Sequence, residues 1–177
     1  FQESVYRYVA IYGAATSPRY HTPERVPDRR MRHAGAVALR QHLKGPIYAH
    51  GQYRLYIDNW GIIGHTGELQ FLYEFSRRFH LRLRERLHYQ RGAVFYRERY
   101  TTERTYMSSD KELSTLWSST TGLKVEYIWR PGFARSLGLE TFGLNAKVDF
   151  LHFDYPEFEP LPNLTAWIAE LGTSVTF

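Results

Sequence analysis

Charged side chains recur at every second position in several segments of the chain, and this spacing suggests a chemical role. Between residues 79 and 89 the odd positions are mostly apolar, whereas the even positions read His80, Arg82, Arg84, Arg86 and His88. Rings of arginine and lysine that line a pore favour anions or phosphates. The charged residues expected to share one inward-facing surface of this kind are Arg40, Arg54, Glu68, Glu74, Arg82, Arg84, Arg86, Lys124, Glu126, Lys147 and Asp149.

The same residues could instead form an ion-pair network. An eight-stranded barrel leaves an interior just wide enough for side chains, so acids and bases would fill it and neutralise one another. A larger barrel would leave the cationic wall facing water. The sequence therefore favours the network if the barrel has eight strands and a selective lining if it has more.

Catalytic and metal chemistry are only weakly indicated. The chain has no cysteine, which excludes a thiolate metal site and a cysteine nucleophile. None of the compact spacings of zinc sites, such as HxH or HExxH, occurs among the histidines that could share the polar face, His42, His50, His80 and His88. Loose candidates for a hydrolase are Ser114, Ser118, Ser119 and His152. We expect no enzymatic activity, cofactor or metal.

The elements that carry these charges are predicted to be β-strands, because successive strand side chains point to opposite faces. The runs 63–75 and 79–89 both alternate, and only three residues centred on Arg77 separate them, so they form a tight hairpin. A turn at that position predicts three cross-strand pairs on the polar face: Glu68 with Arg86, Gln70 with Arg84, and Glu74 with His80.

The whole chain, residues 1–177, is predicted to be a single all-β domain, an antiparallel up-and-down transmembrane β-barrel of about eight strands. The strands are expected at about 3–13, 30–43, 47–58, 63–75, 79–89, 113–129, 139–153 and 164–177. Short links at 44–46, 76–78 and about 130–138 alternate with long ones at 14–29, 98–112 and 154–163, with 59–62 as a short exception. This alternation is typical of outer-membrane barrels.

Composition is compatible with that fold. Aromatic residues make up 16 % of the chain, as expected of the interfacial girdles of a membrane barrel. The longest apolar run falls far short of the roughly 20 residues of a membrane-spanning helix, so a span would have to be a closed barrel. The net charge is +5, but lysine and arginine alternate within strands instead of gathering in a tail, so we expect no nucleic-acid partner.

The end of the chain carries a more specific pattern. A polar residue, a glycine two positions later and alternating apolar residues that end in an aromatic are provided by Glu170, Gly172, Val175 and Phe177. This resembles the C-terminal assembly signal of bacterial outer-membrane barrels. The resemblance implies insertion by the barrel-assembly machinery, which reads the last strand by edge pairing, and a periplasmic C-terminus.

A second resemblance lies in the middle of the chain. The segment 56–62, which reads Tyr-Ile-Asp-Asn-Trp-Gly-Ile, and later pieces such as 93–96 and 108–113 are similar to an uncharacterised family of outer-membrane barrel proteins. The similarity covers roughly residues 30–130. Members of that family are usually about twice this long, which implies that an N-terminal half is missing here.

These features together predict a protein of the bacterial outer membrane that acts as a structural barrel or pore. Its expected partners are the lipid bilayer, the barrel-assembly machinery and other envelope proteins, which would bind loops 14–29, 98–112 and 154–163. A soluble, lipocalin-like ligand-binding barrel is the alternative, and it would need apolar residues inside. An outer-membrane hydrolase is a further and weaker alternative.

Overall fold

The computed structural model describes residues 7–13, 17–130, 138 and 140–176. Within that part it contains nine strands and one short 3-10 helix, η1 (Lys111–Leu113). The strands are β1 (Tyr8–Tyr12), β2 (Pro18–Pro23), β3 (Arg32–Lys44), β4 (Ile47–Asp58), β5 (Ile63–Glu74), β6 (Phe79–Arg91), β7 (Leu116–Trp129), β8 (Thr141–Asp154) and β9 (Asn163–Thr176). No helix in these ranges is long and apolar enough to cross a membrane.

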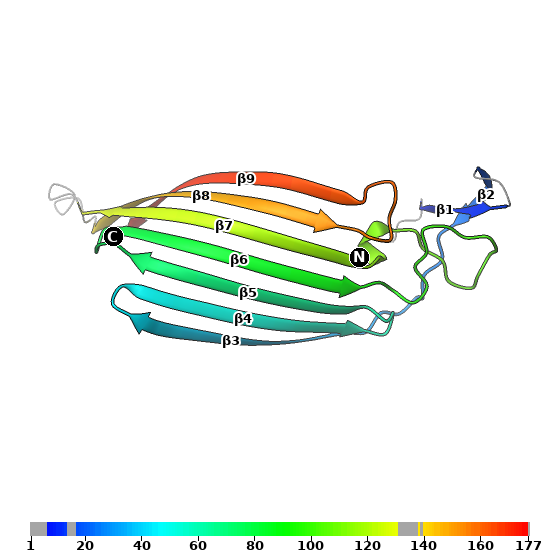
Figure 1. Cartoon of the computed structure of the whole chain (residues 1–177), viewed down its shortest axis with the longest axis horizontal. Helices are drawn as coiled ribbons and strands as arrows, with labels where there is room; N and C mark the ends of the chain where they lie inside the picture. The colour runs from blue at the N-terminus through cyan, green and yellow to red at the C-terminus, as the bar shows by residue number, and fades with distance from the viewer. Residues whose placement is uncertain (1–6, 14–16, 131–137, 139, 177) are drawn as a thin grey trace.

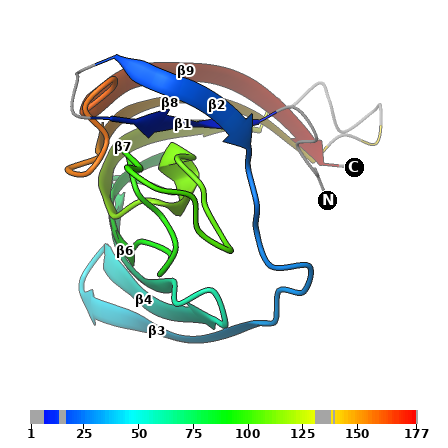
Figure 2. The same cartoon turned by 90° about the vertical axis from the view of Figure 1, so that its right-hand side faces the viewer.

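Seven long strands form one antiparallel sheet in chain order, from β3 at one edge to β9 at the other (Figure 1). Seen end-on, the sheet bends into an open C (Figure 2). The predicted all-β, antiparallel up-and-down arrangement is therefore confirmed. The structure differs from the prediction in two ways, because the main sheet has seven strands and it is not closed into a barrel.

The strand expected at 3–13 is the one that leaves the main sheet, so its predicted place in the barrel was wrong. Its described part, β1, pairs with β2 in a separate two-stranded sheet. The physical reason is that β1 is apolar on the side where Val9 and Ile11 lie, and both are buried against Tyr100 and Met107. Those partners belong to a loop and not to the main sheet.

The short links 44–46 and 76–78 lie at one end of the sheet and the long links 98–112 and 154–163 at the other, as predicted. The short exception 59–62 lies at the end of the long links, and the predicted loop 14–29 contains strand β2. At one end, β5 and β6 are joined by a tight turn in which Ser76 and Phe79 exchange backbone hydrogen bonds of 3.3 Å. In the turn between β3 and β4, Gly45 has a φ of 57°, a left-handed conformation that favours glycine. The third link at this end, predicted at 130–138, lies mostly outside the described residues.

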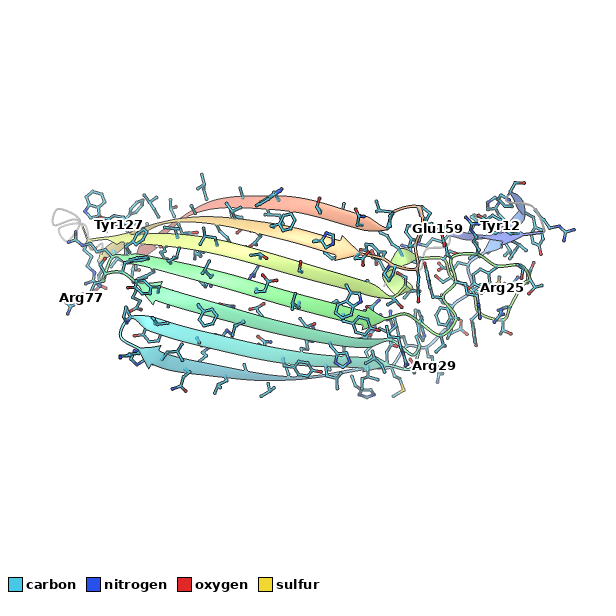
Figure 3. The ribbon with its side chains drawn as sticks, in the orientation of Figure 1. Tyr12, Arg25, Arg29, Arg77, Tyr127 and Glu159 are labelled. Carbon is cyan, nitrogen blue, oxygen red and sulfur yellow. The ribbon has the colours of Figure 1, made fainter. Side chains whose placement is uncertain are left out.

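The long links build a compact cap at the other end, made of β1, β2, residues 92–115 and residues 155–162. Figure 3 places Arg77 and Tyr127 at the turn end and Tyr12, Arg25 and Glu159 at the cap end. Arg25 and Met107 exchange backbone hydrogen bonds of 3.0 and 2.7 Å. Every buried hydrophobic residue of the described chain lies in the cap or beside it: Val9, Ile11, Ile62, Ala93, Tyr96, Tyr100, Met107, Leu113 and Tyr155. The long strands therefore have no dry core on either face.

Candidate functional site

The register of β5 and β6 brings the predicted charged residues together on one face. Glu68 lies opposite Arg86, Gln70 opposite Arg84, and Glu74 opposite His80, so the three predicted pairs are confirmed. The register continues across the neighbouring strands. The described side chains on this polar face include all those predicted for it: Arg40, Arg54, Glu68, Glu74, Arg82, Arg84, Arg86, Lys124, Glu126, Lys147 and Asp149.

This polar face is the concave face of the sheet. Gln90 shares it, and its Nε2 donates to the carbonyl oxygens of Glu112 (2.9 Å) and Ser114 (3.1 Å). Those two residues belong to the cap segment that lies within the curve of the sheet (Figure 2). The charged residues therefore line the inside of the C.

A short ion-pair network joins three strands on the concave face. Nη2 of Arg84 lies 3.1 Å from Oδ2 of Asp149, and Nζ of Lys147 lies 2.8 Å from the same oxygen. Lys147 also reaches Oε1 of Glu170 at 3.0 Å. Asp149 is only 4 % exposed and packs its other carboxylate oxygen against Gly122, where a Cβ would collide with it. Among the described charged residues predicted for this face, ion pairs are therefore found only in this patch.

Most of the other cations on the concave face have no counter-ion among the described residues. Glu68 lies opposite Arg86, but its carboxylate accepts a hydrogen bond from Nε2 of Gln70. Glu68 and Arg86 therefore form no ion pair, although they are cross-strand neighbours. Among the described residues, no hydrogen bond or ion pair is made by Arg40, Arg54, Arg82, Arg86 or Lys124. Because no described residue forms an ion pair with these cations, the concave face presents a positively charged surface.

The convex face has the opposite character. Phe71, Leu83, Leu123 and Val148 lie in one row across β5, β6, β7 and β8, and all four are exposed. The exposure is greatest on β9, where Leu171 is 89 % exposed. Other exposed apolar side chains on this face are Val37, Leu39, Tyr53, Leu69, Leu87, Leu144 and Trp167. The outer surface of the sheet is therefore broadly apolar.

The Asp-Asn-Trp-Gly turn between β4 and β5 is built around one buried carboxylate. Oδ2 of Asp58 accepts from Nε of Arg30 (2.8 Å) and from the Tyr56 hydroxyl (3.0 Å). Oδ1 accepts from the backbone N–H groups of Trp60 and Ile62, both at 3.0 Å. The Arg30 guanidinium also stacks over the Trp60 ring at 4.4 Å. This motif thus holds the cap end of the sheet together, a role that its sequence alone does not predict.

Two buried tyrosines hold the cap segments to each other. Burial, together with the nearby carboxylates of Glu98 and Glu157, raises the pKa of Tyr96 to about 12. Its hydroxyl therefore stays protonated and donates to the carbonyl oxygen of Glu157 at 3.1 Å. The hydroxyl of Tyr100 accepts from the Ser108 N–H at 3.0 Å and donates to the Phe95 carbonyl oxygen.

The weaker sequence candidates gain no support from the geometry. Ser119 lies opposite His152, yet no hydrogen bond joins them in the described chain. Ser114 is buried and donates to the carbonyl oxygen of Lys111 at 2.6 Å. Ser118 lies opposite His88 and Phe153. No group of three histidine, aspartate or glutamate side chains in the described residues could hold a metal ion.

The residues of the predicted assembly signal lie along the edge strand β9. Glu170 faces Lys147 on the concave side, and Gly172 packs against the side chain of Asn145. Val175 is exposed and lies opposite Phe142. Phe177 lies outside the described residues.

Comparison with known proteins gives a family but no activity. A family described as "Protein of unknown function (DUF3570)" matches residues 1–174, and the chain therefore belongs to that family. The match extends the resemblance to an uncharacterised family from roughly residues 30–130 to nearly the whole chain. Neither the curated proteins nor the solved structures contain a match.

Proposed function

We propose that this member of the DUF3570 family forms part of the wall of an outer-membrane β-barrel whose lumen is an anion-selective pore. One observation carries the proposal, namely the separation of exposed apolar side chains on the convex face from unneutralised cations on the concave face. Transmembrane barrels alternate in this way along each strand, with lipid outside and a polar interior.

The convex face supports a lipid environment. Soluble monomers rarely expose contiguous apolar patches larger than a few hundred Å². Here the apolar row runs across four neighbouring strands, from Phe71 to Val148, and reaches Ala169 on β9. Leu171, the next residue of β9 on this face, is 89 % exposed. The long strands have 12 to 14 residues, and a tilted strand of about 9–11 residues suffices to cross the hydrocarbon layer.

The edge strand β9 supports insertion through the assembly machinery. Glu170, Gly172 and Val175 occupy the positions of the expected signal, and β9 pairs only with β8 in the described sheet. Its outer edge is therefore available for the strand addition by which such machinery recognises its substrates.

The concave face supports passage of anions. Burying unpaired cations costs several kcal/mol each, so such residues persist where water reaches them. Arg54, Arg82 and Arg86 then hold a positive potential along the wall, which attracts anions and repels cations. The cap segment 92–115 lies inside the curve at one end (Figure 2), so it would narrow that mouth of the pore. A lipocalin-like binder would need an apolar concave face, which this sheet does not have.

The test begins with the full-length protein in cell envelopes. We expect it in the outer-membrane fraction, with a gel mobility that changes on boiling. The detergent-purified protein is then inserted into planar bilayers under a KCl gradient, where the sign of the reversal potential should show a several-fold preference for chloride. A soluble protein without heat-modifiable mobility would refute the barrel, and a folded barrel that prefers potassium or does not conduct would refute the anion pore.

A further inference from the structure

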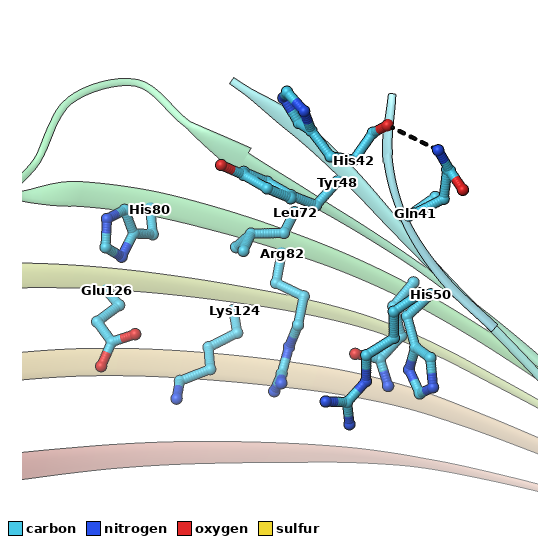
Figure 4. A pocket seen from close by; sticks show the side chains of 12 residues that line it. Gln41, His42, Tyr48, His50, Leu72, His80, Arg82, Lys124 and Glu126 are labelled. Atoms are coloured by element: carbon cyan, nitrogen blue, oxygen red, sulfur yellow. Dashed lines mark hydrogen bonds between the residues drawn. The ribbon is translucent and has the colours of Figure 1, made fainter. Parts of the chain in front are cut away.

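The concave face is hollowed near the turn end of the sheet, away from the cap. The hollow has a volume of about 470 Å³, within the range of small-molecule sites. Three cations line it, Arg40, Arg82 and Lys124, together with one carboxylate, Glu126. Figure 4 shows Arg82, Lys124 and Glu126 extending in the same direction from neighbouring strands.

Two of these cations form an unusual cross-strand pair. Arg82 on β6 lies directly opposite Lys124 on β7, and like charges placed in this way destabilise a sheet. Lys124 also lies opposite Lys147 on β8, but Lys147 is neutralised by Asp149 and Glu170. The Arg82–Lys124 pair has no such counter-ion among the described residues.

Further hydrogen-bonding side chains surround this pair. The hollow is also lined by Tyr48, Gln70 and the three histidines His42, His50 and His80. Glu126 lies opposite His80, and these two residues form the next pair on the same face after Arg82 and Lys124. The cations outnumber the single carboxylate, so an anion that enters the hollow meets a net positive charge.

We propose that this hollow binds small phosphate-bearing solutes, held between the Arg82 guanidinium and the Lys124 ammonium, with Arg40 of β3 as the third cation of the lining. The inference rests on the proposed pore, because it requires solutes to reach the concave face. Arginine presents a fork of donors that matches phosphate oxygens, and lysine adds a compact charge. A bound phosphate would supply the counter-ion that the cross-strand pair lacks.

The test compares two double variants that each remove two cations from the concave face. R82Q/K124Q removes the two cations proposed to hold the phosphate. R54Q/R86Q is the matched control, because Arg54 and Arg86 do not line the hollow. Tripolyphosphate is titrated in two ways: as a blocker of chloride current through the full-length protein in planar bilayers, and as a stabiliser of the detergent-solubilised protein against heat. Both variants are first checked for heat-modifiable mobility.

We expect R82Q/K124Q to weaken tripolyphosphate block and stabilisation about tenfold or more, and R54Q/R86Q to weaken them less than about threefold. Both variants should lose chloride preference to a similar degree. The phosphate site would be overturned, and the pore left intact, if the two variants weakened tripolyphosphate binding equally. The same conclusion would follow if the unsubstituted protein bound malonate as tightly as tripolyphosphate. Stabilisation that depends on Arg82 and Lys124 in a protein without chloride preference would support the site and refute the proposed pore.

Discussion

At the scale of single residues, Asp58 ties three parts of the cap end together. It is 6 % exposed and accepts from a side chain before β3, from its own strand and from the following turn. The Asp-Asn-Trp-Gly segment stands out in the sequence, but its partner Arg30 lies 28 residues earlier. Local patterns do not report such distant contacts, so the role of Asp58 could not be predicted.

Asp58→Ala should destabilise the folded protein by about 3 kcal/mol, because it leaves a partly buried guanidinium and two backbone N–H groups without an acceptor. The measurement is the urea midpoint at which the heat-modifiable form disappears. Asp28→Ala is the control, since Asp28 is exposed and has no hydrogen bond or ion pair within the described chain. Equal midpoints for the two variants would show that the Asp58 contacts do not stabilise the fold.

At the scale of elements, alternation in the sequence located the seven long strands to within about three residues at each end. The hairpin at Arg77 also fixed its register, because a one-residue slip would exchange the two faces. The pattern failed for β1, which is too short and too apolar on both sides to reveal its partner. Alternation also could not predict which opposite charges would form ion pairs, because that depends on how far the side chains reach. Arg84 on β6, for example, forms its ion pair with Asp149 on β8, two strands away.

A charge placed on the convex face distinguishes lipid from water as its surroundings. Leu123 is 42 % exposed and lies between Leu83 and Val148. In a bilayer, Leu123→Arg should cost about 2–4 kcal/mol and reduce the folded fraction in vesicles, whereas at a soluble surface it would be nearly neutral. Gln52→Arg on the concave face, opposite Glu68, is the control and should fold normally. Refolding yield in lipid vesicles measures both, and a Leu123→Arg variant that refolds as well as the control contradicts a lipid-facing surface.

At the scale of the whole molecule, the directions of the strands constrain how the sheet can close. Seven strands alternate in direction from β3 to β9, so the two edge strands both run away from the cap. If the edges met directly, they would pair in parallel. Bacterial outer-membrane barrels are antiparallel throughout and have an even number of strands. The eight-stranded closure predicted from the sequence is not found, because the segment counted as its first strand pairs with β2 in the cap and leaves seven strands in the sheet.

A closed antiparallel barrel that contains this sheet needs an odd number of further strands between β9 and β3. Because the chain has no cysteine, engineered cysteine pairs can test this in the full-length protein. Leu151→Cys with Ala166→Cys, which lie opposite each other on β8 and β9, should form a disulfide on oxidation. Ala166→Cys combined with Ala34→Cys, Ala36→Cys or Ala38→Cys on β3 should not, because one intervening strand separates the edges by about 10 Å, beyond the roughly 7 Å that a disulfide spans. A disulfide within one chain between β3 and β9 would instead mean that the seven strands close on themselves through a parallel pair, and the lumen would then be too narrow for the proposed pore.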